Sequence, residues 1–161
     1  MTENEKMTHL NQKGEANMVN ITSKKMSDRT AVAIGIVEMK KETLDLLKNN
    51  AFEKGDVLSV ARVAGIMASK QTPNLIPLCH PLDITQAAID FDLNEEENLL
   101  KIMATIKTHG KTGVEMEALT AVSIASLTVY DMCKSIDKGM KIKINLFSKK
   151  GGKSGDIHFN K

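Results

Sequence analysis

The chain has 161 residues, of which 42% are hydrophobic and only 3% are aromatic. Its net charge is +2, from 22 basic and 20 acidic residues. The small charge and the scarcity of base-stacking aromatics argue against a nucleic-acid-binding protein. This length fits one domain with a core of Leu, Ile, Val, Ala and Met. A core with so few rings gains from burial against a partner, so we expect an oligomer.

No apolar run is long enough to span a bilayer, and the polar N-terminus has no apolar signal segment. We therefore expect a cytoplasmic protein with a flexible leader, residues 1–18, and a single domain, residues 19–161. Two cysteines, Cys79 and Cys133, are expected to remain free thiols in a reducing compartment.

The first half of the domain is predicted to form one strand followed by two helices. Residues 30–39 are apolar and β-branched and predict a strand, and residues 40–50 predict a helix that stops at Asn-Asn. Residues 54–71 predict a second helix that runs into Pro73 and stops there, with Asp56 as its N-cap.

The second half predicts two strands, a long helix and a last strand. Residues 83–93 and 97–109 alternate as strands around an acidic turn, and residues 113–137 form an apolar helix that is buried or at an interface. Residues 140–150 alternate again and predict the final strand. With the two early helices taken as one crossover, the order is βαββαβ. This predicts a ferredoxin-like α+β fold, an antiparallel sheet with helices on one face.

The segment LIPLCHPL, residues 75–82, places Cys79 and His80 between two prolines, which predicts a stiff, non-helical segment. It could be a structural corner, half of a metal site, a nucleophile with its base, or a pocket wall. Zinc would need ligands that the sequence does not supply at CxxC spacing. Neighbouring side chains on an extended segment point to opposite faces, which disfavours a dyad. We expect His80 to act as a pocket donor or base and Cys79 to pack inward.

The long predicted helix carries Glu117 and Asp131 on one stripe, about 21 Å apart along its axis. They cannot reach one reacting atom from a single helix. Either they serve two ends of a long ligand, or each completes a site with a neighbouring chain. Asp131 and Lys134 could be an ordinary surface pair. Their apolar flanks instead predict partial desolvation, which moves pKa values toward neutrality and suits acid–base chemistry.

Two segments rich in glycine and lysine are candidates for anion binding. Residues 108–117 place Lys111 before a helix start, although the P-loop spacing is absent. The alternative is an ordinary helix start capped by Thr112. Residues 148–156 are either a solvated tail or a mobile basic flap. The flap would close three lysines over phosphates: Lys149, Lys150 and Lys153.

Four stretches of the chain together resemble the MoaC family, the cyclic pyranopterin monophosphate synthases of molybdenum cofactor biosynthesis. They are residues 8–21, 54–82, 110–134 and 151–156. The resemblance implies a ferredoxin-like subunit in a homohexamer, a trimer of dimers with active sites between subunits. It also implies a lyase that rearranges 3′,8-cyclo-7,8-dihydroguanosine triphosphate to cyclic pyranopterin monophosphate and releases diphosphate.

The resemblance also implies roles for individual residues. Asp131 would be the acid–base residue, with Lys134 and Lys54 completing a catalytic cluster. The substrate contacts would be Leu78, Cys79, His80, Glu115, Met116 and Glu117. Looser candidates for holding the triphosphate are Arg29, Lys149 and Lys153. The match departs near Arg29, where Val32 stands at a position that can hold a second basic residue.

A lysine–carboxylate cluster can supply the proton transfers of ring opening and closure, and lysines can stabilise the departing diphosphate. We therefore expect no cofactor and no metal ligands, with the use of Mg²⁺ left open by the residues. The only partners expected are the small-molecule substrate and other copies of the chain. Two rival functions are a non-catalytic anion-binding oligomer and a different nucleoside-triphosphate hydrolase.

Overall fold

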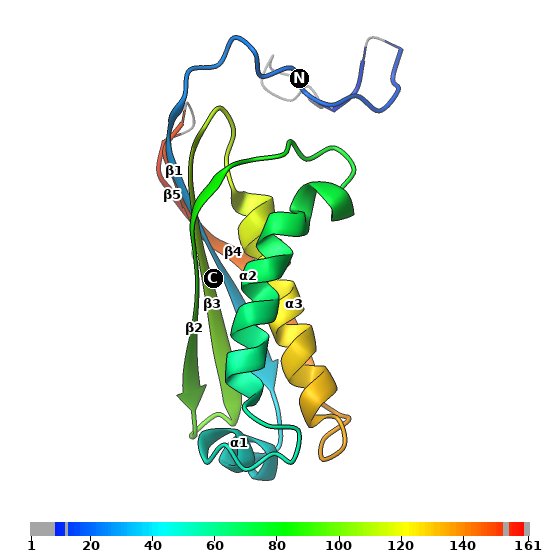
Figure 1. Cartoon of the computed structure of the whole chain (residues 1–161), viewed down its shortest axis with the longest axis vertical. Coiled ribbons are helices and arrows are strands. Elements are labelled where there is room, and N and C mark those ends of the chain that lie inside the picture. Colours follow the sequence, from blue (N-terminus) through cyan, green and yellow to red (C-terminus); the bar gives the residue numbers. More distant parts are fainter. Residues whose placement is uncertain (1–8, 12, 153–154, 160–161) are drawn as a thin grey trace.

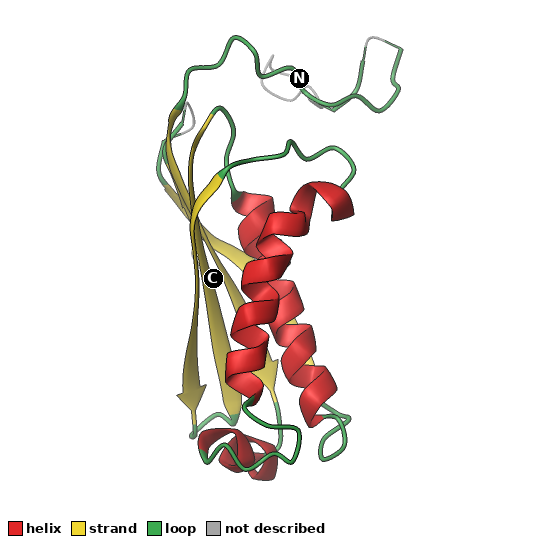
Figure 2. Cartoon of the chain, viewed as in Figure 1, coloured by secondary structure: helices red, strands yellow, loops and turns green. Residues whose placement is uncertain are grey.

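A computed structural model describes residues 9–11, 13–152 and 155–159. Five strands form one antiparallel sheet in the order β2-β3-β1-β4-β5, and α2 and α3 lie side by side over one face of it (Figures 1 and 2). The elements are β1 Ser27–Glu38, α1 Lys41–Lys48, α2 Val57–Leu75, β2 Ile84–Asn94, β3 Leu99–Gly110, α3 Glu115–Cys133, β4 Lys141–Lys150 and β5 Ile157–His158. The predicted α+β, ferredoxin-like class is confirmed, including the segregation of the helices to one face.

The core lies between the central strand β1 and helix α3. Ala31, Ala33 and Val37 of β1 are fully buried. Between them, Gly35 lies so close to α3 that an added Cβ would come within 2.7 Å of Ser126 Oγ. This glycine therefore lets Val122 and Ser126 of α3 approach the sheet closely, while Ala121 and Ala125 of α3 lie against Gly65 of α2.

Helix α2 begins as predicted, because the Asp56 side chain accepts a hydrogen bond from Ser59 N. The prediction that it stops at Pro73 is wrong, since the helix continues to Leu75. Pro73 has no N–H for the Ser69 carbonyl, but Thr72 Oγ1 donates to that carbonyl at 3.0 Å. The helix ends at the next proline, Pro77, which favours an extended conformation at Ile76 (φ −112°, ψ 109°).

Helix α3 begins at Glu115 with Val114 at the N-cap position, so the proposed Thr112 cap is wrong. The helix is shorter than predicted and ends at Cys133. Its middle is buried, as the apolar pattern predicted. Both Cys79 and Cys133 are free thiols.

The C-terminal segment forms a strand that the sequence did not predict. Strand β5 pairs with β4, and the His158 ring packs edge-on against Phe147 with centroids 6.3 Å apart. Gly151 N donates to Asp156 Oδ1 across the connecting segment. A two-residue strand has no periodicity to detect, which explains the miss. Lys153 lies outside the described residues.

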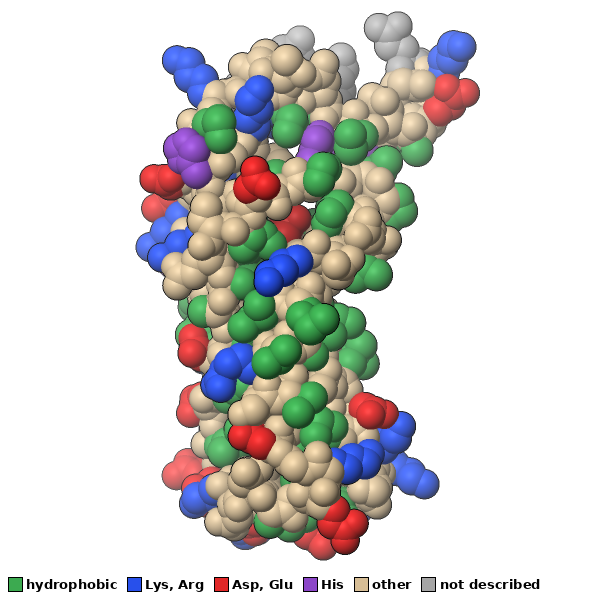
Figure 3. Space-filling view, viewed as in Figure 1, with side chains coloured by type: hydrophobic (Ala, Val, Ile, Leu, Met, Phe, Trp, Pro, Cys, Tyr) green, Lys and Arg blue, Asp and Glu red, His purple; other side chains and the backbone are tan. Residues whose placement is uncertain are grey.

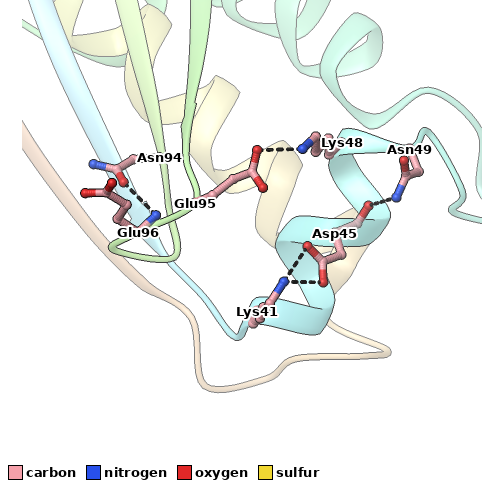
Figure 4. Close-up of polar contacts among 7 residues, drawn as sticks. All are labelled: Lys41, Asp45, Lys48, Asn49, Asn94, Glu95 and Glu96. Atoms are coloured by element: carbon pink, nitrogen blue, oxygen red, sulfur yellow. Dashed lines mark hydrogen bonds and ion pairs between the residues drawn. The ribbon is translucent and has the colours of Figure 1, made fainter.

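Helix α1 lies at the opposite end of the molecule from the N-terminal segment (Figure 1). Lys48 pairs with Glu95 in the β2–β3 turn at 2.6 Å, and Lys41 pairs with Asp45 within the helix (Figure 4). These pairs are exposed and contribute little stability. None of the described helices is both long enough and apolar enough to cross a membrane.

Candidate active site

A large basic cavity lies at the end of the molecule where α3 begins. Its volume is about 820 Å³. Five of its lining side chains are cationic, and one is a carboxylate. The lining residues are Ser23, Lys24, Lys25, Ser27, Arg29, Lys111, Thr112, Gly113, Glu115, Lys149 and Gly152. This excess of positive charge suits a polyanion such as a triphosphate.

Arg29 is fixed in the wall of the basic cavity by backbone groups. Its Nε donates to Gly110 O at 3.0 Å, and a second guanidinium nitrogen donates to Lys111 O at 3.3 Å. Gly152 passes directly over it, with φ +80° and room for no Cβ, since that atom would come within 2.1 Å of the guanidinium. The Gly-Gly pair after β4 therefore lets the C-terminal segment close against Arg29.

The lysines of this cavity differ in their partners. Lys149 Nζ pairs with Glu115 Oε1 at 3.0 Å, while Lys111 Nζ donates to Thr22 O at 2.9 Å. Lys24 and Lys25 are exposed lining residues that the sequence analysis missed. The available signal was the basic pair directly before β1, which periodicity reasoning passed over.

A second, smaller cavity of about 200 Å³ adjoins the first. It shares Thr112, Gly113 and Glu115 with the basic cavity. The structure brings all six predicted substrate contacts into its wall: Leu78, Cys79, His80, Glu115, Met116 and Glu117. His9 and Leu82 complete the lining and were not predicted. The rigid LIPLCHPL segment thus forms a pocket wall, packed against the start of α3.

Glu117 is the most perturbed acid of the smaller cavity. Glu117 is only 3% exposed. Burial, reinforced by the charge of Glu115, raises the pKa of Glu117 to about 7. A carboxyl group with this pKa can both donate and accept a proton near neutrality. Burial and the charge of Glu117 also raise the pKa of the half-buried Cys79, which keeps that thiol protonated.

His80 connects the pocket wall to the N-terminal segment. Its Nε2 lies 2.8 Å from Val19 O, and because a carbonyl only accepts, this ring nitrogen donates the hydrogen bond. The bond ties the backbone at Val19 to a side chain that lines the smaller cavity. The expected role of His80 as a donor or base toward a ligand stays a prediction.

The third group, called the lower cluster, comprises Lys54, Asp131 and Lys134. Lys134 Nζ lies 2.6 Å from Asp131 Oδ1, and Lys54 Nζ donates to Asp131 O at 3.2 Å. The structure thus assembles the predicted cluster from the α1–α2 loop and the end of α3.

The expected desolvation of the lower cluster is wrong for the single chain. The Asp131 and Lys134 side chains are 65% and 51% exposed. The hydrogen bond and charge of Lys134 lower the pKa of Asp131, and the same pair raises the pKa of Lys134. Both shifts go away from neutrality. The reason is that Asp131 and Lys134 lie on the outer side of the last turn of α3, whereas Met132 and Cys133 between them are buried in the core.

The lower cluster and the smaller cavity lie at opposite ends of α3, a long helix that lies across the sheet beside α2 (Figure 1). Glu117 and Asp131 are about 21 Å apart along this helix. One chain therefore does not bring all the predicted site residues together. Within the described parts of the chain, no three His, Cys, Asp or Glu residues are grouped so that they could hold a metal ion.

The sequence model of the MoaC family matches residues 18–152. This chain belongs to the MoaC family. The matched range includes every lining residue of the two cavities except His9, and it includes the whole lower cluster.

Curated relatives of this MoaC chain match it over almost its full length. A cyclic pyranopterin monophosphate synthase from Clostridium perfringens (strain SM101 / Type A) is 56% identical over 96% of this chain and 98% of its own. Proteins with the same name from Natranaerobius thermophilus and Desulforamulus reducens are 55% and 57% identical. They are matched over 95% and 94% of this chain and 97% and 92% of their own.

Proposed function

We propose that this chain is a cyclic pyranopterin monophosphate synthase. In this proposal it is a lyase that converts (8S)-3′,8-cyclo-7,8-dihydroguanosine 5′-triphosphate to cyclic pyranopterin monophosphate and diphosphate, in molybdenum cofactor biosynthesis. The observation that carries the proposal is the shared wall of the two cavities. A basic cavity of about 820 Å³ adjoins a smaller one that contains a carboxyl group with a pKa near 7.

The basic cavity suits the triphosphate. Arg29, Lys111 and Lys149 come from three different strands and loops and converge on one space. Cations placed around a triphosphate stabilise the charge that develops when diphosphate departs. This step needs no redox cofactor. We assign Lys153 to the same role from the family resemblance alone.

The smaller cavity suits the purine-derived ring system. Leu78 and Met116 offer apolar contacts, and His80 offers a polar ring edge. Glu117 can exchange a proton with the ring at neutral pH, as ring opening and reclosure require. Cys79 remains a protonated wall residue rather than a nucleophile.

We further propose a homohexamer, a trimer of dimers, in which the lower cluster of one chain completes the cavities of another. The separation along α3 supports this arrangement, because the cluster cannot reach Glu117 of its own chain. Exposed hydrophobic side chains on α2 and α3 also support an interface (Figure 3): Val60, Val63, Met67 and Leu127. Burial by a neighbouring chain would desolvate Asp131 and Lys134 and prepare them for acid–base chemistry.

A cytoplasmic location is part of the proposal. It is supported by two free cysteines, which are usual in a reducing compartment. The proposed partners are the small-molecule substrate and further copies of the chain.

The test is to incubate the purified chain with the cyclic dihydroguanosine triphosphate and to follow both products, the pterin and diphosphate. We expect equal amounts of the two. GTP and ATP should release no phosphate under the same conditions. Phosphate release from GTP or ATP without a pterin would favour the rival hydrolase. Binding of the substrate with no turnover would favour the non-catalytic rival.

A further inference from the structure

Glu115 is an unexpected residue in the wall of the basic cavity. It is the one carboxylate among the described lining residues, and it also lines the smaller cavity. A carboxylate repels phosphate, so its presence beside five cationic side chains needs an explanation. The family resemblance would make it a substrate contact, but its closest partner within the chain is a lysine.

The contact between Glu115 and Lys149 joins the first residue of α3 to the end of β4. Their charged atoms are 3.0 Å apart, and the side chains are only 27% and 26% exposed. By comparison, in the other lysine ion pairs among the described residues, the lysine side chain is at least half exposed. The partial burial reduces screening by water and salt and makes this pair stronger than a typical surface pair.

Gly113 makes the geometry of the pair possible. A Cβ on this residue would come within 1.9 Å of Glu115 Oε2. The Glu115 side chain therefore folds back over the glycine, into space that any other residue would fill. Gly113 thus leaves room for the Glu115 carboxylate beside the backbone, so that this carboxylate is partly buried rather than fully solvated.

Lys149 also differs from the neighbouring cations that have known partners. Arg29 and Lys111 donate to backbone carbonyls, which leave their full positive charge available to a ligand. Among the described residues that line the cavity, Lys149 is the cation whose charge a carboxylate cancels. It also lies directly beside the boundary that the two cavities share, since its partner Glu115 lines both.

We infer that Glu115 is an internal counter-ion of Lys149. Glu115 pairs with Lys149 in the free protein, and a phosphate of the bound triphosphate replaces Glu115 as the partner of Lys149. The inference rests on the proposed function, because it takes the basic cavity as the triphosphate site. Glu115 is thus a positioning residue rather than a substrate contact. Exchange of partners keeps Lys149 ordered before the ligand arrives and leaves a free carboxylate at the wall of the smaller cavity afterward.

The experiment measures binding of inorganic triphosphate to the full chain by calorimetry. Glu115→Gln is introduced into the wild type, into Lys149→Met and into Lys111→Met. Lys111→Met is the matched control, because Lys111 lines the same cavity but bonds to a carbonyl. We expect Glu115→Gln to tighten binding about threefold to tenfold in the wild type and in Lys111→Met, and less than about twofold in Lys149→Met.

Three results would overturn the inference. Weaker binding by Glu115→Gln would mean that Glu115 contacts the ligand. An equal gain in all three backgrounds would mean that Glu115 merely repels the anion. No gain in any background would mean that the pair is structural. Thermal unfolding confirms that each variant is folded. The proposed function is tested separately. A wild type that binds triphosphate but forms no pterin would contradict the function, and it would leave the comparison of Glu115→Gln across the three backgrounds valid.

Discussion

The two ends of helix α3 present carboxylates in opposite electrostatic states. Near its start, Glu117 is buried and its pKa is raised to about 7. Near its end, Asp131 is exposed, and Lys134 lowers its pKa. The same helix carries both groups, and the difference is in what covers them. The LIPLCHPL segment and the N-terminal segment lie at the first end, whereas the second needs another chain to lose its water.

The largest expected effect concerns the lower cluster. Lys134→Ala should reduce turnover of the cyclic triphosphate by about a hundredfold to ten-thousandfold, as expected for loss of an acid–base group. Binding of inorganic triphosphate should change much less than turnover, because the cations of the basic cavity remain in place. Lys138→Ala, which removes a lysine four positions on, is the control and should keep its turnover. Normal turnover by Lys134→Ala would remove the cluster from catalysis.

A mixing experiment tests whether the two ends work together across chains. Co-expressed Lys134→Ala and Glu117→Gln chains should recover up to about a quarter of wild-type turnover, because a quarter of randomly formed shared sites have both intact ends. Co-expressed Lys134→Ala and Asp131→Ala chains should recover none, since both defects lie at the same end. Mixed assemblies that show no recovery would place the whole site within one chain.

The contrast in burial predicts a pH-dependent difference in stability. For Glu117 the native state binds the proton more tightly than the unfolded state, so stability falls as pH rises from about 4.5 to about 7. The destabilisation that comes from ionising the buried Glu117 is complete above that pH range and absent below it. Glu117→Gln should therefore increase the free energy of unfolding by up to roughly 3 kcal/mol at about pH 8.5, and by almost nothing at about pH 4.

Urea unfolding at one fixed protein concentration measures this difference. Asp131→Asn is the matched variant at the other end and should give no gain at the higher pH. Its carboxylate is already stabilised by Lys134 in the charged form. An equal gain in both variants would show that burial does not distinguish the two ends of α3.

The smallest expected effect is at His80. His80→Ala removes a cavity side chain and its hydrogen bond to Val19 O, a loss worth about 1 kcal/mol. We expect the KM for the cyclic triphosphate to rise about fivefold to tenfold, with no change in assembly. Size-exclusion chromatography checks the assembly. Collapse of the oligomer would instead support the role of a structural corner.

The sequence predicted the secondary structure well where local patterns decide it. The alternation of β3 and the Asp56 cap of α2 are local features, and the structure confirms both. The errors arose where a tertiary contact overrides a local rule. Helix α2 passes Pro73 because Thr72 satisfies the Ser69 carbonyl, and β5 exists because β4 offers it an edge. Neither contact has a signature in a short window of sequence.

The site shows the same division. The chemistry-bearing residue types and their grouping at the two ends of α3 followed from the sequence and its family resemblance. Helical geometry alone indicated that Glu117 and Asp131 of one chain cannot reach the same reacting atom. What only the tertiary structure decided is the environment of each group. Glu117 is buried, Asp131 is exposed, and Glu115 folds over Gly113 onto Lys149. Solvation and partner choice depend on atoms brought together from distant segments, and a linear pattern does not contain them.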